Sequence, residues 1–226
     1  MRRFIMKILI IGASRGIGLE FVRQYAHAGA QVTATARNEE GLQKIKALGA
    51  KAVRLDVADP TSVGALAGML DGEKFDVAIY VAGVYTQAGA MSPPTQAEFD
   101  HVMHANVLGA MQTIPHVAPI VAQAKGKFIF ISSDMGCIGE TRASFAWTYR
   151  VSKAALNMAV VAAQHDYPDA LMLPMHPGWV RTDMGGPNAS IGTDASVTAM
   201  CTTIAGLTAK DKGRYLHYDG RAFSSW

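Results

Sequence analysis

The stretch that decides the fold is Lys7-Ile8-Leu9-Ile10-Ile11-Gly12-Ala13-Ser14-Arg15-Gly16-Ile17-Gly18. An apolar run of strand length leads directly into glycines spaced G-x-x-x-G-x-G, and a helical pattern follows. A strand that is apolar at every position fits a parallel sheet covered on both faces. The glycines permit a tight turn and a close approach of the backbone to a pyrophosphate, whose charge the helix N-terminus stabilises. The alternative is an ordinary strand–helix turn, but after the first strand of a wound sheet the pattern favours dinucleotide binding.

The rest of the chain alternates short apolar runs with amphipathic helical patterns. Strands are predicted at Ile8–Ile11, Gln31–Ala36, Ala52–Leu55, Val77–Val81, Lys127–Ile131, Leu171–Met175 and Arg214–His217. Helices are predicted at Ile17–Ala28, Glu39–Leu48, Thr61–Leu70, Gln96–Gln123 (one helix or two), Tyr149–Gln164 and Asp194–Leu207. Right-handed connections between such elements give a doubly wound, Rossmann-type α/β sheet. Ligands bind such sheets beyond the carboxyl ends of the strands, where every motif below falls.

Length and composition predict a single domain over residues 1–226, since half the residues are hydrophobic and no linker divides the chain. The net charge of +3 is scattered, which argues against a nucleic-acid partner. No apolar run is long enough for a membrane span. Met1–Ile11 superficially resembles a signal peptide, but Lys7 interrupts its short apolar run and a buried strand explains it better. We therefore expect a cytoplasmic protein. Neither the two cysteines nor the seven histidines have metal-site spacing.

Two arginines indicate which dinucleotide binds. Sites for NAD usually place an acidic residue at the end of the second strand to hold the ribose 2′-hydroxyl. Here the strand ends at Arg37, and Arg15 in the glycine turn can approach from the other side. Guanidinium groups form bidentate bonds with a 2′-phosphate, so NADP(H) is the predicted cofactor. The alternative is that both arginines are solvated surface residues.

A second constellation predicts proton transfer. Tyr149 and Lys153 are four positions apart and share one helix face. A neighbouring ammonium group and a positively charged nicotinamide would favour the phenolate and lower the pKa of Tyr149 from its usual value of about 10. The predicted strand Lys127–Ile131 ends in Ser132-Ser133, and a serine hydroxyl there can polarise a carbonyl oxygen. Chance surface spacing is the alternative for Tyr149 and Lys153 taken alone.

At this point the chain resembles the short-chain dehydrogenase/reductase family over nearly its whole length. The motifs that carry the resemblance are Gly12-x-x-x-Gly16-x-Gly18, Asp56-Val57, Ala82-Gly83, Asn106, Ser133, Tyr149-x-x-x-Lys153 and Pro177-Gly178. The longer phrases Tyr149–Asn157, His176–Gly186 and Tyr218–Gly220 resemble the branch of sniffer-type carbonyl reductases and C-factor.

The resemblance implies seven parallel strands in the order 3-2-1-4-5-6-7 and a role for each matching residue. Ser133 and Tyr149 would hold the substrate oxygen, Lys153 would lower the pKa of Tyr149, and Asn106 would position a water molecule. The cofactor would be bound by the following residues: Gly12, Ser14, Arg15, Gly16, Ile17, Gly18, Arg37, Asp56, Val57, Ala82, Gly83, Tyr149, Lys153, Pro177, Gly178, Val180 and Thr182. Relatives pair through the helices matching Gln96–Gln123 and Tyr149–Gln164, so a homodimer or homotetramer is expected.

Three positions depart from the family pattern. Ile11 stands where the family usually has threonine, and Val81 stands where it usually has an asparagine that braces the sheet. The separation of Ser133 from Tyr149 is longer than usual, so the connecting loop must bulge, and Ser132 is a second candidate for the catalytic serine.

The predicted function is reduction of a small-molecule carbonyl (a ketone, aldehyde or quinone) to an alcohol, with NADP(H) as hydride donor. The candidate pocket walls are apolar, namely Tyr85, Met135, Phe145, Trp147, Trp179 and Met184. The loop from Trp179 to Thr193 is either a lid or a plain connection. The alternative function is an NADP(H)-binding sensor or C-factor-like signalling protein with little turnover. An epimerase or dehydratase would need a different glycine turn and a longer C-terminal region.

Overall fold

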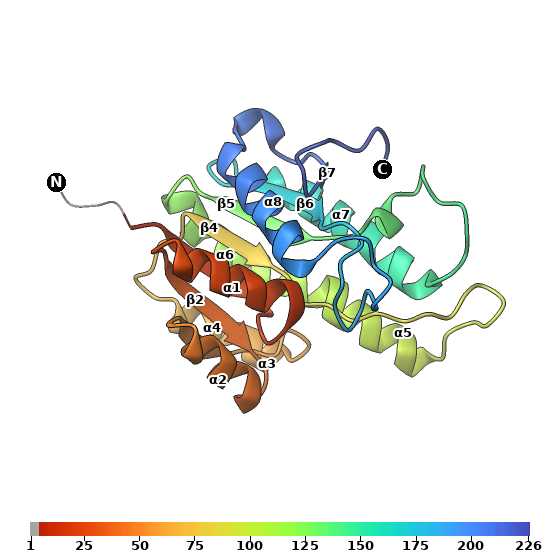
Figure 1. The fold of residues 1–226 in the computed structure, drawn as a ribbon, viewed down its shortest axis with the longest axis horizontal. Helices are drawn as coiled ribbons and strands as arrows, with labels where there is room; N and C mark the ends of the chain where they lie inside the picture. Colours follow the sequence, from red (N-terminus) through yellow and green to blue (C-terminus); the bar gives the residue numbers. More distant parts are fainter. Residues whose placement is uncertain (1–4) are drawn as a thin grey trace.

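The computed structural model describes residues 5–226; residues 1–4, the start of the segment that resembles a signal peptide, lie outside the described residues. One sheet carries seven parallel strands in the order β3-β2-β1-β4-β5-β6-β7, which confirms the predicted order. The strands are β1 (Lys7–Ile11), β2 (Gln31–Ala36), β3 (Lys51–Arg54), β4 (Val77–Tyr80), β5 (Lys127–Ile131), β6 (Leu171–His176) and β7 (Leu216–His217). Because all seven run in one direction, their carboxyl ends meet at one edge, on the right in Figure 1.

Both faces of the sheet are buried, as the apolar strands predict. In β1, Ile8 and Ile10 belong to one hydrophobic cluster, whereas Leu9 and Ile11 belong to a second cluster on the opposite face. All four side chains are 0% exposed. This alternation follows from the two-residue period of a strand, and it explains why the run tolerates no polar residue.

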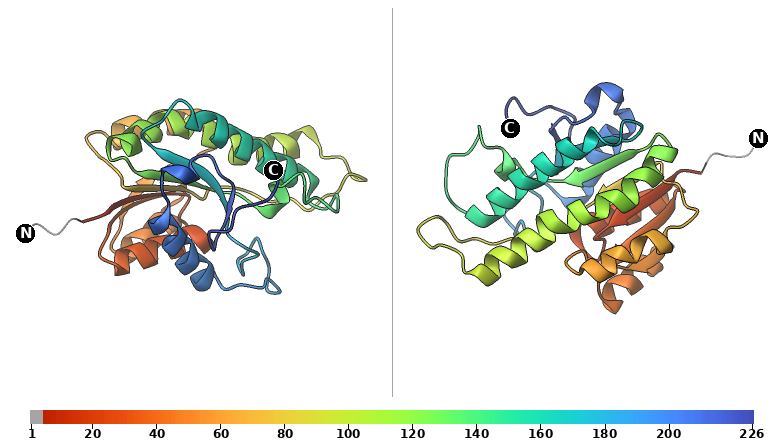
Figure 2. Two further views of the ribbon diagram at one scale, coloured as in Figure 1. Left: turned by 90° about the horizontal axis from the view of Figure 1, so that it is seen from above. Right: turned by 180° about the vertical axis from the view of Figure 1, so that it is seen from behind.

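Helices cover both faces, and Figure 2 shows the sheet between the two layers. The first cluster is closed by α1 (Gly16–His27), α2 (Glu39–Ala47) and α8 (Thr193–Gly206). The second is closed by α3 (Pro60–Gly64), α4 (Leu66–Met69), α6 (Gly109–Gln123) and α7 (Trp147–Gln164). The remaining helices are α5 (Gln96–Met103), the π-helix η1 (His104–Leu108) and the 3₁₀ turns η2 (Asp134–Gly136) and η3 (Ala209–Asp211).

Two predicted elements differ from the observed ones in more than their end residues, and the structure decides a third, the predicted one or two helices over Gln96–Gln123. The predicted helix Thr61–Leu70 is broken into the short helices α3 and α4, which fits the low helix propensity of Gly64 and Gly68. The last strand is only two residues long, because the chain turns at Gly220 and Leu216 pairs antiparallel with Ala222. The segment Gln96–Gln123 is one continuous helical rod of α5, η1 and α6.

Two further observations bear on the predicted partners. No helix between residues 5 and 226 is long and apolar enough to cross a membrane. Within the same part of the chain, no three histidine, cysteine, aspartate or glutamate side chains gather into a potential metal site. Cys137 and Cys201 are free thiols. The predicted cytoplasmic location stays a prediction.

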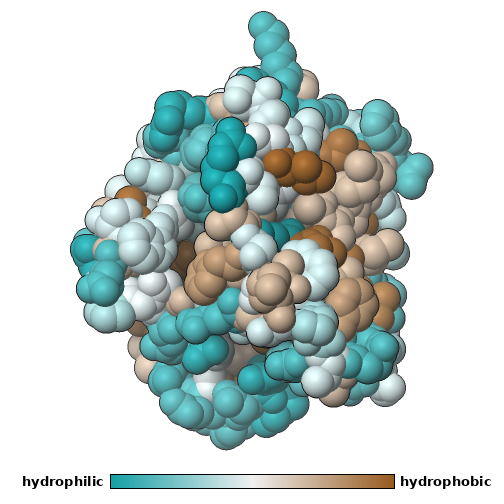
Figure 3. Space-filling view, turned by 90° about the vertical axis from the view of Figure 1, so that its right-hand side faces the viewer, coloured by the Kyte–Doolittle hydropathy of each residue, from teal (hydrophilic) through white to brown (hydrophobic). Residues whose placement is uncertain are grey.

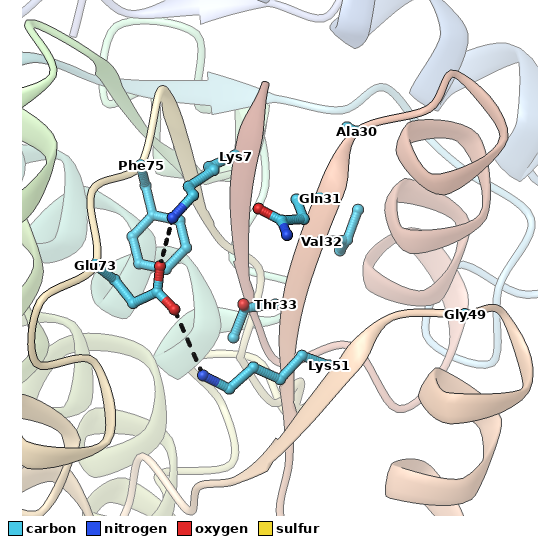
Figure 4. Close-up of a pocket in the computed structure, with 9 residues that line it drawn as sticks. All are labelled: Lys7, Ala30, Gln31, Val32, Thr33, Gly49, Lys51, Glu73 and Phe75. Carbon is cyan, nitrogen blue, oxygen red and sulfur yellow. Dashed lines mark hydrogen bonds and ion pairs between the residues drawn. The ribbon is translucent and has the colours of Figure 1, made fainter. Parts of the chain in front are cut away.

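A cavity of about 340 Å³ lies at the amino ends of the first three strands (Figure 4). Glu73 forms ion pairs with the two lysines that line this cavity, at 2.9 Å from Lys7 and 3.6 Å from Lys51. None of the predicted site residues lines it. It lies at the opposite edge of the sheet from the motifs, so we look for the functional site at the carboxyl ends.

Candidate functional site

The glycine turn between β1 and α1 is packed so closely that side chains are excluded. Gly12 has φ +88°, and a Cβ atom there would lie 2.7 Å from the backbone of Ala82. A Cβ atom on Gly18 would lie 2.2 Å from the carbonyl oxygen of Gly12. The Gly12 amide donates to Thr35 Oγ1 at 3.1 Å, which ties the turn to the end of β2. The sequence G-x-x-x-G-x-G is therefore required by packing as well as by the predicted ligand.

The other predicted motifs lie next to this turn. A Cβ atom on Gly16 would lie 3.3 Å from Thr182 Cγ2, so the loop after β6 contacts the glycine turn. A Cβ atom on Gly83 would lie 3.1 Å from Asn106 Oδ1 and 3.6 Å from Lys153 Nζ. Gly83, which is predicted to line the ribose, therefore lies directly against Asn106 and Lys153, two of the predicted catalytic residues.

Asn106 lies in the π-helix η1, which places one extra residue in the helical rod. Its Oδ1 accepts the Val84 amide at 2.7 Å, while its Nδ2 donates to the Val84 carbonyl at 2.9 Å and to Ser152 Oγ at 2.9 Å. The side chain is fully buried. Single π turns within α-helices are frequent at functional sites. Here the turn aims an amide that fixes the backbone beside Gly83.

The two candidate serines point in different directions. Ser132 is buried and its hydroxyl donates to Asn157 Oδ1 at 2.5 Å, beneath the site. Ser133 Oγ instead accepts the Met135 amide at 3.2 Å and donates to Asp134 Oδ1 at 3.1 Å, and a hydrogen bond with Ser133 acts to lower the pKa of the Tyr149 phenol. Of the two serines, only Ser133 therefore faces the predicted proton donor.

Lys153 is buried and its ammonium group donates to the Ile131 carbonyl at 2.9 Å. Its Nζ lies 5.6 Å from the centroid of the Tyr149 ring. Burial lowers the pKa of Lys153 to about 8, because few polar groups replace its hydration. A lysine with such a pKa can release its proton near neutral pH.

The pKa of Tyr149 differs from the prediction. Burial raises it above its ordinary value, and the hydrogen bond with Ser133 opposes that effect only in part. The expected lowering by Lys153 is not found, because Lys153 is directed at the Ile131 carbonyl and desolvation of the phenol dominates. In the protein alone, Tyr149 is therefore a neutral hydrogen-bond donor.

The adenine end of the predicted site is marked by arginines. Arg37 follows β2 and is exposed, and among residues 5–226 none accepts a hydrogen bond from its side chain. Arg15 pairs with Asp183 at 3.0 Å, but both side chains are largely exposed, and such pairs contribute little. Asp56 and Val57 follow β3, where Asp56 Oδ1 accepts the Ala58 amide at 3.0 Å.

The loop after Pro177-Gly178 is well hydrogen-bonded. Trp179 Nε1 donates to the Gly185 carbonyl at 2.9 Å, and Arg181 Nη1 donates to the Ala189 carbonyl at 3.0 Å. Val180 forms a bridge with Ile191. The loop is therefore folded and contacts the glycine turn, and a lid function stays a prediction.

Apolar side chains surround this edge, and Figure 3 shows them gathered on the face seen from that side. Tyr85 meets the ring of Tyr149 edge to face, with centroids 5.0 Å apart, and Phe145 follows at 6.4 Å from Tyr85. Phe145, Trp147, Trp179 and Met184 are all exposed. Five of the six predicted pocket walls are therefore exposed or contact Tyr149, although aromatic residues of this size are usually buried.

The long segment between Ser133 and Tyr149 does bulge. Residues 138–145 are all exposed and form the loop at the right of Figure 1. The loop returns at Ala146, which adopts φ +57° although it is not glycine. The Ala146 and Trp147 amides donate to the carbonyls of Gln87 and Ala88, at 3.2 and 2.9 Å. These bonds hold the strained residue that starts the helix of Tyr149.

Sequence reasoning missed several residues that support the site. Thr35 bonds the glycine turn, Asn157 bonds Ser132, and Tyr215 and His176 bond the backbone beside Ser133. Asn157 had a usable signal, because it lies four residues after Lys153 on the same helix face. The other three are separated in sequence from the groups they hold, so only the fold brings them together.

The family model described as short chain dehydrogenase matches residues 6–190. The chain therefore belongs to the short-chain dehydrogenase family, as the sequence motifs predicted.

Individual relatives confirm the predicted branch. The C-signal protein of Myxococcus xanthus is 36% identical over 148 residues, which cover 64% of this chain and 89% of that protein. A short-chain dehydrogenase/reductase of Burkholderia multivorans, solved with bound NADP, superimposes with a TM-score of 0.88 at 29% identity, covering 99% of this chain and 100% of that one. The carbonyl reductase Sniffer of D. melanogaster superimposes with a TM-score of 0.87 at 25% identity, with the same coverage.

The burial of Lys153 predicts a pH dependence of stability. Between pH 8 and 10.5 the folded protein binds fewer protons at this lysine than the unfolded chain does, so its contribution to stability rises with pH. Lys153→Met should remove that rise with pH. At pH 7 it should increase the free energy of unfolding by up to about 3 kcal/mol, reduced by the loss of the hydrogen bond to the Ile131 carbonyl. Urea unfolding from pH 7.5 to 9.5 measures both effects.

The matched control for this test is Lys44→Met, which alters an exposed lysine and should keep the wild-type rise. If the difference between wild type and Lys153→Met does not change with pH, the described burial of the ammonium group is wrong.

Proposed function

We propose that this protein is an NADP(H)-dependent reductase of small carbonyl compounds. The observation that supports this most is the placement of Asn106 and Lys153 against Gly83, with the Tyr149 ring 5.6 Å from Lys153 Nζ, beside a glycine turn that excludes side chains. A protein that only binds a nucleotide has no need for a buried phenol with a buried lysine 5.6 Å from its ring.

The residues present fit the proposed cofactor. Gly12 and Gly18 pack the turn closely against neighbouring backbone, and the half-buried Gly16 begins α1, where the pyrophosphate would bind. Arg37 is free among the described residues to hold the 2′-phosphate, with Arg15 opposite it. The remaining predicted contacts divide along the dinucleotide. Adenine would contact Asp56 and Val57; the ribose and nicotinamide would contact Ala82, Gly83, Pro177, Gly178, Val180 and Thr182; and Ser14 and Ile17 would flank the phosphates. When bound, the nicotinamide supplies the hydride.

The side chains of this chain would supply orientation and the proton. Ser133 and Tyr149 would donate hydrogen bonds to the substrate oxygen, and the Tyr149 phenol would transfer its proton as charge develops there. Its high pKa means that it holds this proton until the substrate oxygen becomes basic. Lys153, whose pKa is about 8, would then supply a proton that restores the neutral phenol of Tyr149.

The substrate would be apolar. Tyr85 and Phe145 form an aromatic wall beside Tyr149, and Trp179 and Met184 are exposed near the same edge. A ketone, aldehyde or quinone with an aromatic or aliphatic substituent matches these surfaces.

A second candidate function is nucleotide sensing or signalling with little turnover. The 36% identity with the C-signal protein favours it. It predicts cofactor binding without reduction of any carbonyl in a broad panel, so the same assays separate the two functions.

The role of Tyr149 is tested with Tyr149→Phe. Loss of the phenolic proton should lower kcat by at least about 1,000-fold, at the upper end of the effect of general acid catalysis. Binding of NADPH, measured by fluorescence titration, should be kept. The control Tyr167→Phe removes a hydroxyl outside the site and should keep wild-type turnover. A Tyr149→Phe protein that still turns over would exclude Tyr149 as the proton donor.

The preference for NADPH is tested with Arg37→Ala. Loss of a charge-assisted bond to the 2′-phosphate should weaken NADPH binding about 10- to 100-fold and leave NADH binding nearly unchanged. Calorimetric titration of both cofactors measures this, with Arg23→Ala on α1 as the control. Equal weakening of both cofactors would show that Arg37 does not recognise the phosphate.

We also propose that two copies associate through α6 and α7, which lie side by side in the right-hand view of Figure 2. Met111, Val151 and Met158 are exposed on these helices, at 51%, 43% and 70%. Met158→Glu should place charge in such an interface and yield monomers in light scattering, whereas Met91→Glu in a distant loop should not. A Met158→Glu protein with wild-type mass would exclude this interface.

A further inference from the structure

The C-terminal segment, residues 215–226, folds onto the loop that follows β5. The Gly139 amide donates to the Trp226 carbonyl at 2.8 Å, and Cys137 Sγ lies 3.3 Å from the Ser225 carbonyl oxygen. The Phe223 amide donates to the Tyr215 carbonyl at 3.0 Å, which closes the segment on itself. The loop that begins with Ser133 is therefore covered by residues from the far end of the described chain.

Aromatic rings make this cover rigid. Tyr215 stacks on Phe223 with centroids 3.9 Å apart, and His217 stacks on the same ring at 3.8 Å. Trp226 stacks on Tyr215 at 5.6 Å. Stacked rings of this kind leave the Tyr215 side chain one orientation, with its hydroxyl buried.

The Tyr215 hydroxyl donates a hydrogen bond to the carbonyl oxygen of Ser133. The same carbonyl accepts the Gly136 amide at 2.8 Å. On the other side of the peptide bond, the Asp134 amide donates to His176 Nδ1 at 3.0 Å. Both polar groups of the peptide bond between Ser133 and Asp134 are thus hydrogen-bonded by side chains. Tyr215, just before β7, binds the carbonyl, and His176, at the end of β6, binds the amide.

A fixed peptide fixes the side chain attached to it. The Cα–Cβ bond of Ser133 leaves this peptide, and its Oγ donates to Asp134 Oδ1 at 3.1 Å and accepts the Met135 amide at 3.2 Å, within hydrogen-bonding influence of the Tyr149 phenol. Stacking on Phe223 requires only a ring, which phenylalanine would also supply. The hydroxyl of Tyr215 therefore adds polar contacts only: a bond to the backbone of Ser133 and hydrogen bonding to the side chains of Asn157 and Ser132 beside it.

We infer that Tyr215 is a positioning residue for the reaction: through the Ser133 carbonyl, its hydroxyl sets the direction of Ser133 Oγ. This rests on the proposed function, because it assumes that Ser133 holds the substrate oxygen. Small displacements of a catalytic group have large effects, since a shift of about 1 Å can cost on the order of 100-fold in rate.

The test is Tyr215→Phe, alone and combined with Ser133→Ala. Tyr215→Phe should lower kcat about 10-fold or more, while the Kd for NADPH stays at the wild-type value. In the Ser133→Ala background the same change should have no further effect on kcat, because the two residues act through one hydroxyl. Multiplicative effects would overturn the inference. Tyr25→Phe, which removes a buried hydroxyl on α1, should keep the wild-type kcat.

A second measurement does not depend on turnover. Amide hydrogen exchange at Asp134 and Gly136 should accelerate in Tyr215→Phe, whereas exchange at Ala13, whose amide bonds the Thr35 carbonyl at 2.8 Å, should not. Unchanged exchange at Asp134 and Gly136 would overturn the inference even if the enzyme is active. If the wild type reduces no carbonyl but exchange accelerates as expected, the proposed function fails while the hold of Tyr215 on the Ser133 peptide stands.

His176→Phe provides an independent variant if Tyr215→Phe folds poorly. It removes the acceptor of the Asp134 amide but keeps an aromatic ring beside His217 and Phe223. It should reproduce both the Ser133-dependent loss of kcat and the faster exchange at Asp134. Wild-type values for both would overturn the inference.

Discussion

Burial of both faces of the sheet is the constraint on which the rest of this structure depends. The central strands are almost entirely apolar, so the polar side chains of the candidate site lie mainly where strands end. Because all seven strands are parallel, those ends share one edge. Side chains from the loops after β1, β4, β5 and β6 therefore meet, although they are widely separated along the chain.

The same constraint explains what sequence could predict. The strand positions followed from apolar runs and glycine turns, and the strand order from the family resemblance. The residues of the predicted catalytic motif Tyr149 and Lys153 lie on one helix face, as their spacing predicts. What could not be predicted depends on desolvation. The pKa of Tyr149 is set by how completely its phenol is buried, which depends on residues such as Tyr85 that a motif does not contain.

Contacts across long sequence distances were equally hidden. Ser132 and Ser133 are neighbours with the same side chain, and only the surroundings separate them: Asn157 lies below one and Tyr149 beside the other. The bond between Tyr215 and Ser133 spans 82 positions. No local pattern encodes such a pair, because neither residue has to deviate from the ordinary preferences of its own strand or loop.

The π turn at His104–Leu108 has a consequence for how the protein can vary. An additional residue in a helix rotates everything after it by about 100° relative to an ordinary helix. The phase of α6 is thus offset from that of α5, and with this offset α6 presents Ile114, Val117 and Val121 to the second cluster. Loss of one residue here would restore regular geometry but would turn either the amide of Asn106 away from Val84 or the apolar stripe of α6 away from the sheet. The number of residues in this helical rod is therefore constrained both by the packing of α6 and by the position of Asn106.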